Sequence, residues 1–69
     1  MIKKQIDKQL IERENGYRFY FQGYVFLSNK SSKEFKLFNS KGVLLSRKKV
    51  KSASKRDFIN WINQKIKKQ

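Results

Sequence analysis

The chain has 69 residues, contains neither cysteine nor histidine, and carries a formal net charge of +13. A chain of this length holds one domain (residues 1–69), which buries only about 60% of its unfolded surface and so has a small core. Disulfides and cysteine metal sites are excluded, and so are the most common general base and the thiol nucleophile. The sequence contains no glycine-rich phosphate loop and no metal-ligand cluster, so we expect a non-enzyme without cofactor or metal.

The positive charge is concentrated in one part of the sequence. Residues 1–14 hold four bases and three acids, whereas residues 15–69 hold fourteen bases and only two acids, Glu34 and Asp57. Such self-repulsion is tolerated mainly where a polyanion relieves it. Nucleic acid is therefore the first candidate partner, followed by an anionic membrane surface and an acidic protein. No stretch approaches the roughly 18 apolar residues that cross a membrane, and no signal-peptide pattern is present, which predicts a cytoplasmic protein.

Residues 2–14 fit two local structures. Ile2, Ile6 and Leu10 lie at helical spacing, which predicts a short amphipathic helix ending near Asn15-Gly16. The same Asn-Gly pair is a strong hairpin signal, which would pair residues 10–14 with residues 17–21. We favour a strand over residues 10–14, preceded by a helical or flexible arm over residues 1–9.

Residues 17–27, YRFYFQGYVFL, form the only long apolar stretch and hold six aromatic side chains. Aromatic and β-branched residues fit a half-buried pleated surface, so we predict one central strand with Tyr17, Phe19 and Phe21 facing the core. Gly23 indicates a bulge or a close backbone approach within this strand. A bulge would switch the core-facing positions after it from odd to even numbers, and the sequence leaves both registers open.

Two further strands follow a polar loop at residues 28–32. Residues 33–38 alternate, with Phe35 and Leu37 on one face, and residues 39–42 have the composition of a hairpin turn. Residues 43–50 are predicted to form the last strand, with Val43 and Leu45 facing inward or, one register over, Leu44. Its second half is a basic run.

A C-terminal helix is predicted over residues 55–67. Ser54 occupies the N-cap position, and an apolar stripe follows, with Trp61 on its edge. The stripe consists of Phe58, Ile59, Ile62 and Ile66. The aromatic sheet is the only available cover for this stripe. We therefore predict an α+β fold: a three- or four-stranded antiparallel sheet with one C-terminal helix packed on one face.

Two modes of nucleic-acid recognition fit the uncovered face of this sheet. A duplex-DNA reader would place polar side chains at base edges in the major groove, and alternation assigns to that face Arg18, Gln22, Lys36, Ser46 and Lys48. A single-strand binder would instead stack bases on Tyr20 and Phe38, with Tyr24 or Phe26 as further candidates. In either mode we expect electrostatic capture of phosphates by Arg47, Lys48, Lys49, Lys51, Lys55 and Arg56.

The order of these features resembles a known family. The segments Arg13-Glu14-Asn15-Gly16-Tyr17-Arg18 and Lys51-Ser52-Ala53-Ser54-Lys55-Arg56-Asp57-Phe58, with aromatic strands between them, resemble the arm-type DNA-binding domain of phage and conjugative-transposon tyrosine integrases. The resemblance covers residues 10–67 and implies a three-stranded antiparallel sheet that enters the major groove, with Arg18, Gln22, Lys36 and Lys48 facing the DNA. Two departures are the lack of a following recombinase domain and strands more aromatic than a groove reader needs.

These observations favour a small basic protein that binds nucleic acid, with duplex DNA ahead of single strands, such as an accessory protein of a phage or mobile element. The alternative is a small protein-interaction module, such as a phage-type inhibitor that docks on an acidic surface of a host protein. Membrane-surface association through the basic helix is a third hypothesis, weakened because the sheet already covers the apolar stripe.

Overall fold

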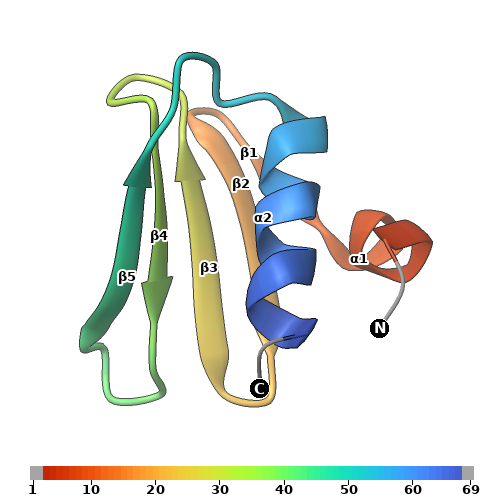
Figure 1. Ribbon diagram of the computed structural model, residues 1–69, viewed down its shortest axis with the longest axis vertical. Helices are drawn as coiled ribbons and strands as arrows, with labels where there is room; N and C mark the ends of the chain where they lie inside the picture. Colours follow the sequence, from red (N-terminus) through yellow and green to blue (C-terminus); the bar gives the residue numbers. More distant parts are fainter. Residues whose placement is uncertain (1–2, 68–69) are drawn as a thin grey trace.

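Five antiparallel strands form a meander in the computed structural model, which describes residues 3–67, and two helices accompany the sheet (Figure 1). In chain order the elements are α1 (Lys3–Gln9), β1 (Ile11–Arg13), β2 (Gly16–Phe21), β3 (Tyr24–Asn29), β4 (Glu34–Phe38), β5 (Leu44–Lys49) and α2 (Lys55–Lys67). The strand order in the sheet is the order in the chain, β1-β2-β3-β4-β5. The α+β class, the antiparallel sheet and the C-terminal helix are confirmed, and the number of strands exceeds the expected three or four.

The aromatic stretch is a hairpin, so its prediction as one central strand is wrong. Gln22 and Gly23 form a two-residue turn with φ angles of 49° and 83°, and Phe21 pairs with Tyr24 across it. Positive φ at both central residues gives a hairpin turn whose twist matches that of the strands. The chain reverses here, and the core-facing positions of β3 are even-numbered, with Phe26 buried. The core-facing positions therefore do change from odd to even numbers after Gly23, but the cause is a reversal of the chain and not a bulge.

The N-terminal segment contains both of the structures that its sequence fits. Helix α1 is followed by the short strand β1, which pairs with β2 in a register that places Arg13 opposite Gly16. The turn is therefore Glu14-Asn15, one residue earlier than the Asn-Gly pair indicates. Ile2, the first residue of the predicted helical stripe, lies outside the described residues.

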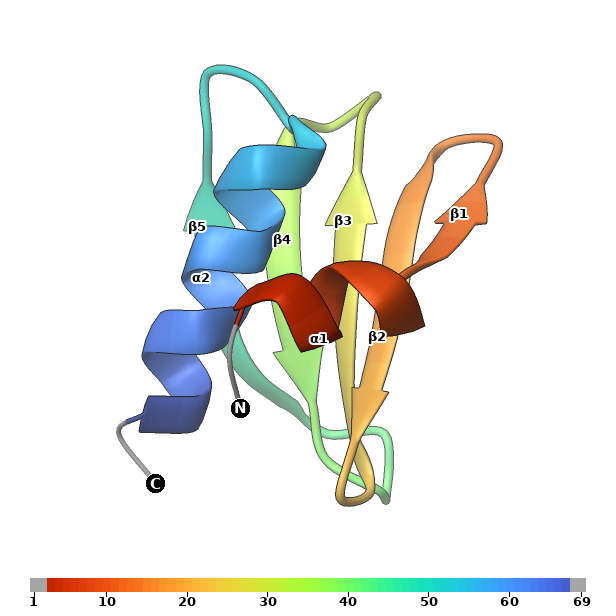
Figure 2. The same cartoon turned by 90° about the vertical axis from the view of Figure 1, so that its right-hand side faces the viewer.

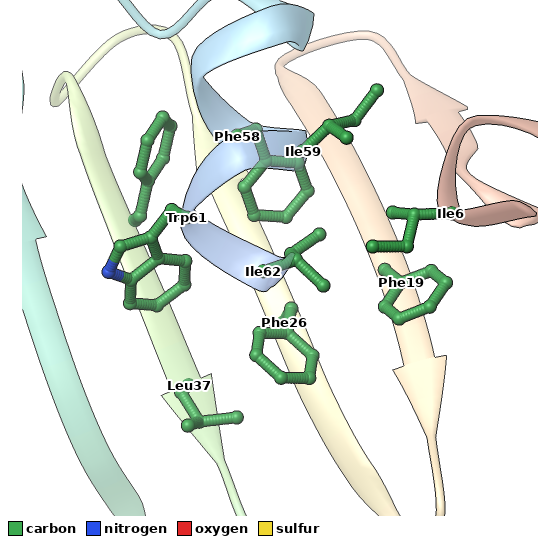
Figure 3. Packing of buried hydrophobic residues seen from close by; sticks show 9 residues of the cluster. Ile6, Phe19, Phe26, Leu37, Phe58, Ile59, Trp61 and Ile62 are labelled. Carbon is green, nitrogen blue, oxygen red and sulfur yellow. The ribbon is translucent and has the colours of Figure 1, made fainter. Parts of the chain in front are cut away.

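The core lies between the sheet and the two helices, which both pack on the same face of the sheet (Figure 2). Phe58 and Ile62 of α2 are fully buried above β2, β3 and β4 (Figure 3). Ile6 of α1 is also fully buried, so the arm is an integral part of the core. Trp61, predicted at the edge of the stripe, is only 4% exposed and packs with its ring centroid 5.5 Å from that of Phe35.

Strand β5 differs from expectation in its inward-facing residues. Val43, Leu44 and Leu45 are 53%, 46% and 50% exposed, so neither register proposed for them holds. An irregularity after Leu37 pairs Phe38 with Leu44, which leaves Leu45 unpaired with β4. Edge strands commonly contain such bulges, which turn side chains away from the layer they would otherwise join.

Helix α2 spans the predicted residues 55–67. Its N-cap is Ser54, whose Oγ accepts a hydrogen bond from the backbone N–H of Asp57 at 3.2 Å. The Ser54 carbonyl also accepts the first helical hydrogen bond, from Phe58 at 3.1 Å.

Candidate nucleic-acid interface

Within residues 3–67 both helices lie on one face of the sheet, and we call the opposite face the open face (Figure 2). Because Phe19 pairs with Phe26 and Phe26 pairs with Leu37 under the helices, the residues next to them along each strand point to the opposite side. The side chains at paired positions on β2, β3, β4 and β5 therefore lie next to one another in a row across this face. We call it the cation row, and it consists of Arg18 (β2), Leu27 (β3), Lys36 (β4) and Arg47 (β5).

A second row of side chains lies beside the cation row, two residues further along β2, β3 and β4 toward the end of the sheet that holds the β2–β3 turn. We call it the apolar row, and it consists of Tyr20 (β2), Val25 (β3), Phe38 (β4) and Leu44 (β5). The Tyr20 side chain is 49% exposed, and its hydroxyl accepts a hydrogen bond from Arg18 Nη1 at 3.5 Å. The open face therefore combines cations with apolar and aromatic surface, which is unusual for a face that only contacts water.

One acid interrupts the positive charge of the open face. Glu34 lies opposite Lys49 in the pairing of β4 and β5, and its side chain is only 12% exposed. Its Oε2 lies 3.6 Å from Arg47 Nε, which makes an ion pair but is too long for a hydrogen bond. Arg47 keeps a side chain that is 56% exposed, so it still presents its guanidinium to solvent.

The structure brings together only part of the predicted groove-facing set. Arg18, Tyr20 and Lys36 share the open face with Arg47 and Lys49. Gln22 does not, because it lies in the turn that reverses the chain. Lys48 and Ser46 do not either: they pair with Phe35 and Leu37, whose side chains point toward the helices. Gln22 was misassigned because the predicted strand continued through a residue that lies in the turn, and Lys48 and Ser46 were misassigned because strict alternation took no account of the irregularity in β5.

The remaining predicted phosphate contacts form a second group around the start of α2. Lys51, Lys55 and Arg56 are all exposed. Lys55 Nζ lies 2.8 Å from Asp7 Oδ1 of α1, and this hydrogen bond and the carboxylate charge raise the pKa of Lys55 above its usual value of 10.5. Lys55 is therefore engaged within the protein, which lowers its availability for a phosphate.

The fold adds further residues to these two places, and sequence reasoning missed those of α1. Lys3 and Lys4 of α1 line a shallow hollow with Lys55 and Arg56, because α1 packs beside the start of α2. Leu27 and Val25 also belong to the open face, as expected from the register in which the core-facing positions switch at Gly23, and the Gln22-Gly23 turn places β3 between β2 and β4. The tertiary contact and the turn carry no signal in the periodicity of the sequence.

Comparison of the chain with protein-family models, curated proteins and solved structures finds no match. The likeness to integrase arm-type domains therefore stays a resemblance. Within residues 3–67 no helix has the length and apolar character needed to cross a membrane. The same residues contain no group of three or more acidic side chains placed to hold a metal ion.

Proposed function

We propose that the protein is a small basic nucleic-acid-binding module whose ligand contacts the open face of the sheet. The observation that carries this proposal is the cation row, in which Arg18, Lys36 and Arg47 lie side by side on the face opposite α1 and α2. A net charge of +13 favours binding to a polyanion, because the bound anion relieves the repulsion between the cations. Phosphate contacts supply most of the non-specific affinity for nucleic acid.

The form of the nucleic acid is a finer proposal. The sequence favours duplex DNA as the ligand, and the protein would then be, for example, an accessory protein of a phage or mobile element. Of the four residues predicted to face the DNA, only Arg18 and Lys36 lie on the open face, because Gln22 and Lys48 lie elsewhere. Arginine pairs well with guanine edges, but two of the four predicted residues, beside an apolar row, can contact few base edges.

The test is a salt titration of binding to labelled DNA, as single strand and as duplex, with matched charge variants. We expect Arg18→Gln and Arg47→Gln each to weaken binding and to reduce the slope of log affinity against log salt by about 0.7 to 0.9. Glu34→Gln should strengthen binding, because it removes the acid that pairs with Arg47. Lys67→Gln is the control, since it removes the same charge from an exposed position on α2.

Equal effects of Lys67→Gln and Arg47→Gln would show that net charge alone acts, and would remove the open face from the proposal. Undetectable binding to both forms of DNA at about 20 mM salt would reject the nucleic-acid function, because electrostatic affinity is greatest there.

A second candidate function, a protein-interaction module, is favoured by the exposed apolar residues at the start of β5. Val43, Leu44 and Leu45 are each about half exposed and adjacent in sequence. Together with the surrounding cations they suit an acidic partner that also presents apolar side chains. Affinity capture with and without nuclease distinguishes the two functions: a specific protein captured equally in both conditions, and lost in Leu44→Ser, would favour this candidate.

A further inference from the structure

The open face repeats one arrangement on two strands. On β2, Arg18 is followed two residues later by Tyr20, and on β4, Lys36 is followed two residues later by Phe38. Both strands run in the same direction, because one antiparallel strand, β3, separates them. The Cα atoms of each cation and its aromatic partner are therefore about 6.7 Å apart along the strand, and the backbones of the two units are about 9.6 Å apart across the sheet.

Between the two units, β3 supplies an apolar floor. Leu27 lies between Arg18 and Lys36, and Val25 lies between Tyr20 and Phe38. In the unit on β2, Arg18 Nη1 donates a hydrogen bond to the Tyr20 hydroxyl, so the position of one side chain restricts that of the other. The open face thus presents two cation–aromatic units of equal polarity on a common apolar base.

We infer that the ligand of this face is an unpaired nucleic-acid strand laid across β2, β3 and β4, with bases stacked on Tyr20 and Phe38 and phosphates held by Arg18 and Lys36. This inference rests on the proposed function and specifies its ligand. A nucleotide presents its phosphate and its base on opposite sides of the sugar, which matches a cation and an aromatic ring on one strand. Base–aromatic stacking tolerates any sequence, because every base has a π-face.

A duplex fits the same surface less well. Its base faces are already stacked on one another, so aromatic side chains gain little from them. Its grooves and backbone present polar edges and phosphates, which Val25, Leu27 and Phe38 cannot pair with and would partly desolvate. A duplex would therefore make few favourable contacts with the apolar row, whereas an unpaired strand contacts both the cation row and the apolar row.

The experiment compares a fluorescent 12-nucleotide strand without self-complementarity and a hairpin duplex in which a loop joins the same 12 nucleotides to their complement, at several salt concentrations. We expect the wild-type protein to bind the single strand more tightly. Tyr20→Ala and Phe38→Ala should each weaken single-strand binding about fivefold to a hundredfold and change duplex binding less than threefold. Tyr20→Phe, which keeps the ring, should retain most of the single-strand affinity. Val43→Ala, an exposed apolar truncation in the β4–β5 loop, should behave as the wild type.

Salt dependence separates stacking from charge. Tyr20→Ala should lower affinity without changing the salt slope, whereas Arg18→Gln should reduce the slope by about 0.7 on the single strand. Circular dichroism confirms that each variant is folded. If Phe38→Ala unfolds, Phe38→Leu retains apolar volume without a ring and should show the same selective loss.

Preferential binding of the duplex, or a Tyr20→Ala variant that binds the single strand as the wild type does, would overturn this inference and leave the proposed function in place. Failure to bind either probe would overturn both.

Discussion

At the scale of single residues, Gly16 has the least space for a side chain among the three glycines. A Cβ atom built there would lie 1.7 Å from the carbonyl oxygen of Ser28 on the neighbouring strand. The restriction arises because two turns meet at this end of the sheet: the Lys30 N–H donates to the Asn15 carbonyl at 2.7 Å, and the Asn15 side-chain amide donates to Asn29 Oδ1 at 3.1 Å. No side chain fits at Gly16 without separating β2 from β3.

Gly16→Ala is therefore expected to lower the free energy of unfolding by at least about 2 kcal/mol, because backbone atoms must move to accept the methyl group. Urea denaturation followed by circular dichroism measures the loss. Gly42→Ala is the matched control: its φ of 82° makes alanine strained, but nothing lies within 4 Å of the new Cβ, so we expect a loss of about 1 kcal/mol. A smaller loss at Gly16 than at Gly42 would contradict the close contact of β2 and β3.

At the scale of elements, the sequence predicts best where the signals are local. Helix α2 was predictable to its ends, because its N-cap serine and its apolar stripe lie within the helix itself or next to it. The hairpin at Gln22-Gly23 was missed because glutamine is not a typical turn residue, and an apolar run gives no sign of reversal.

The candidate site was predictable to the extent that alternation held. Arg18 and Lys36 lie on the face assigned to them, because each belongs to a strand that alternates without interruption. Lys48 was misplaced because β5 contains an irregularity, which a sequence pattern cannot locate. The pairing of Lys55 with Asp7 depends on how α1 packs against α2, a tertiary contact between residues 48 positions apart.

The N-cap of α2 provides a test at this scale. Ser54→Ala removes the acceptor for the Asp57 N–H, so we expect a loss of about 1 kcal/mol and a fall in Tm of about 4 to 8 °C. Thermal unfolding by circular dichroism measures it, with Ser52→Ala as the control because Ser52 is exposed two residues before the cap. Ser54→Asp should retain the cap, since aspartate is an equally good N-cap residue. Equal melting temperatures for Ser54→Ala and the wild type would show that the cap contributes nothing to stability.

At the scale of the whole molecule, excess positive charge opposes the compact fold. The principal extents are 27 × 27 × 20 Å, which is less than the Debye length of about 30 Å at 0.01 M salt. At that ionic strength every cation therefore repels every other across the whole protein. Acids such as Glu34 and Asp7, which pair with Arg47 and Lys55, offset only part of this repulsion, because five acids face eighteen bases. A bound polyanion would relieve the same repulsion, so stability and ligand binding are coupled.

We therefore expect the melting temperature to rise as sodium chloride increases from about 0.01 M to 0.15 M, because the Debye length falls to about 8 Å and most cation pairs become screened. The control is a variant with Lys41→Gln and Lys67→Gln, two exposed cations outside the open face, whose melting temperature should be higher at low salt and should rise less with added salt. A saturating 12-nucleotide strand at low salt should stabilise the wild-type protein more than salt alone, because it adds binding free energy to screening. A melting temperature that falls with salt would show that favourable ion pairs outweigh the net repulsion, and would remove charge relief as a driving force for binding.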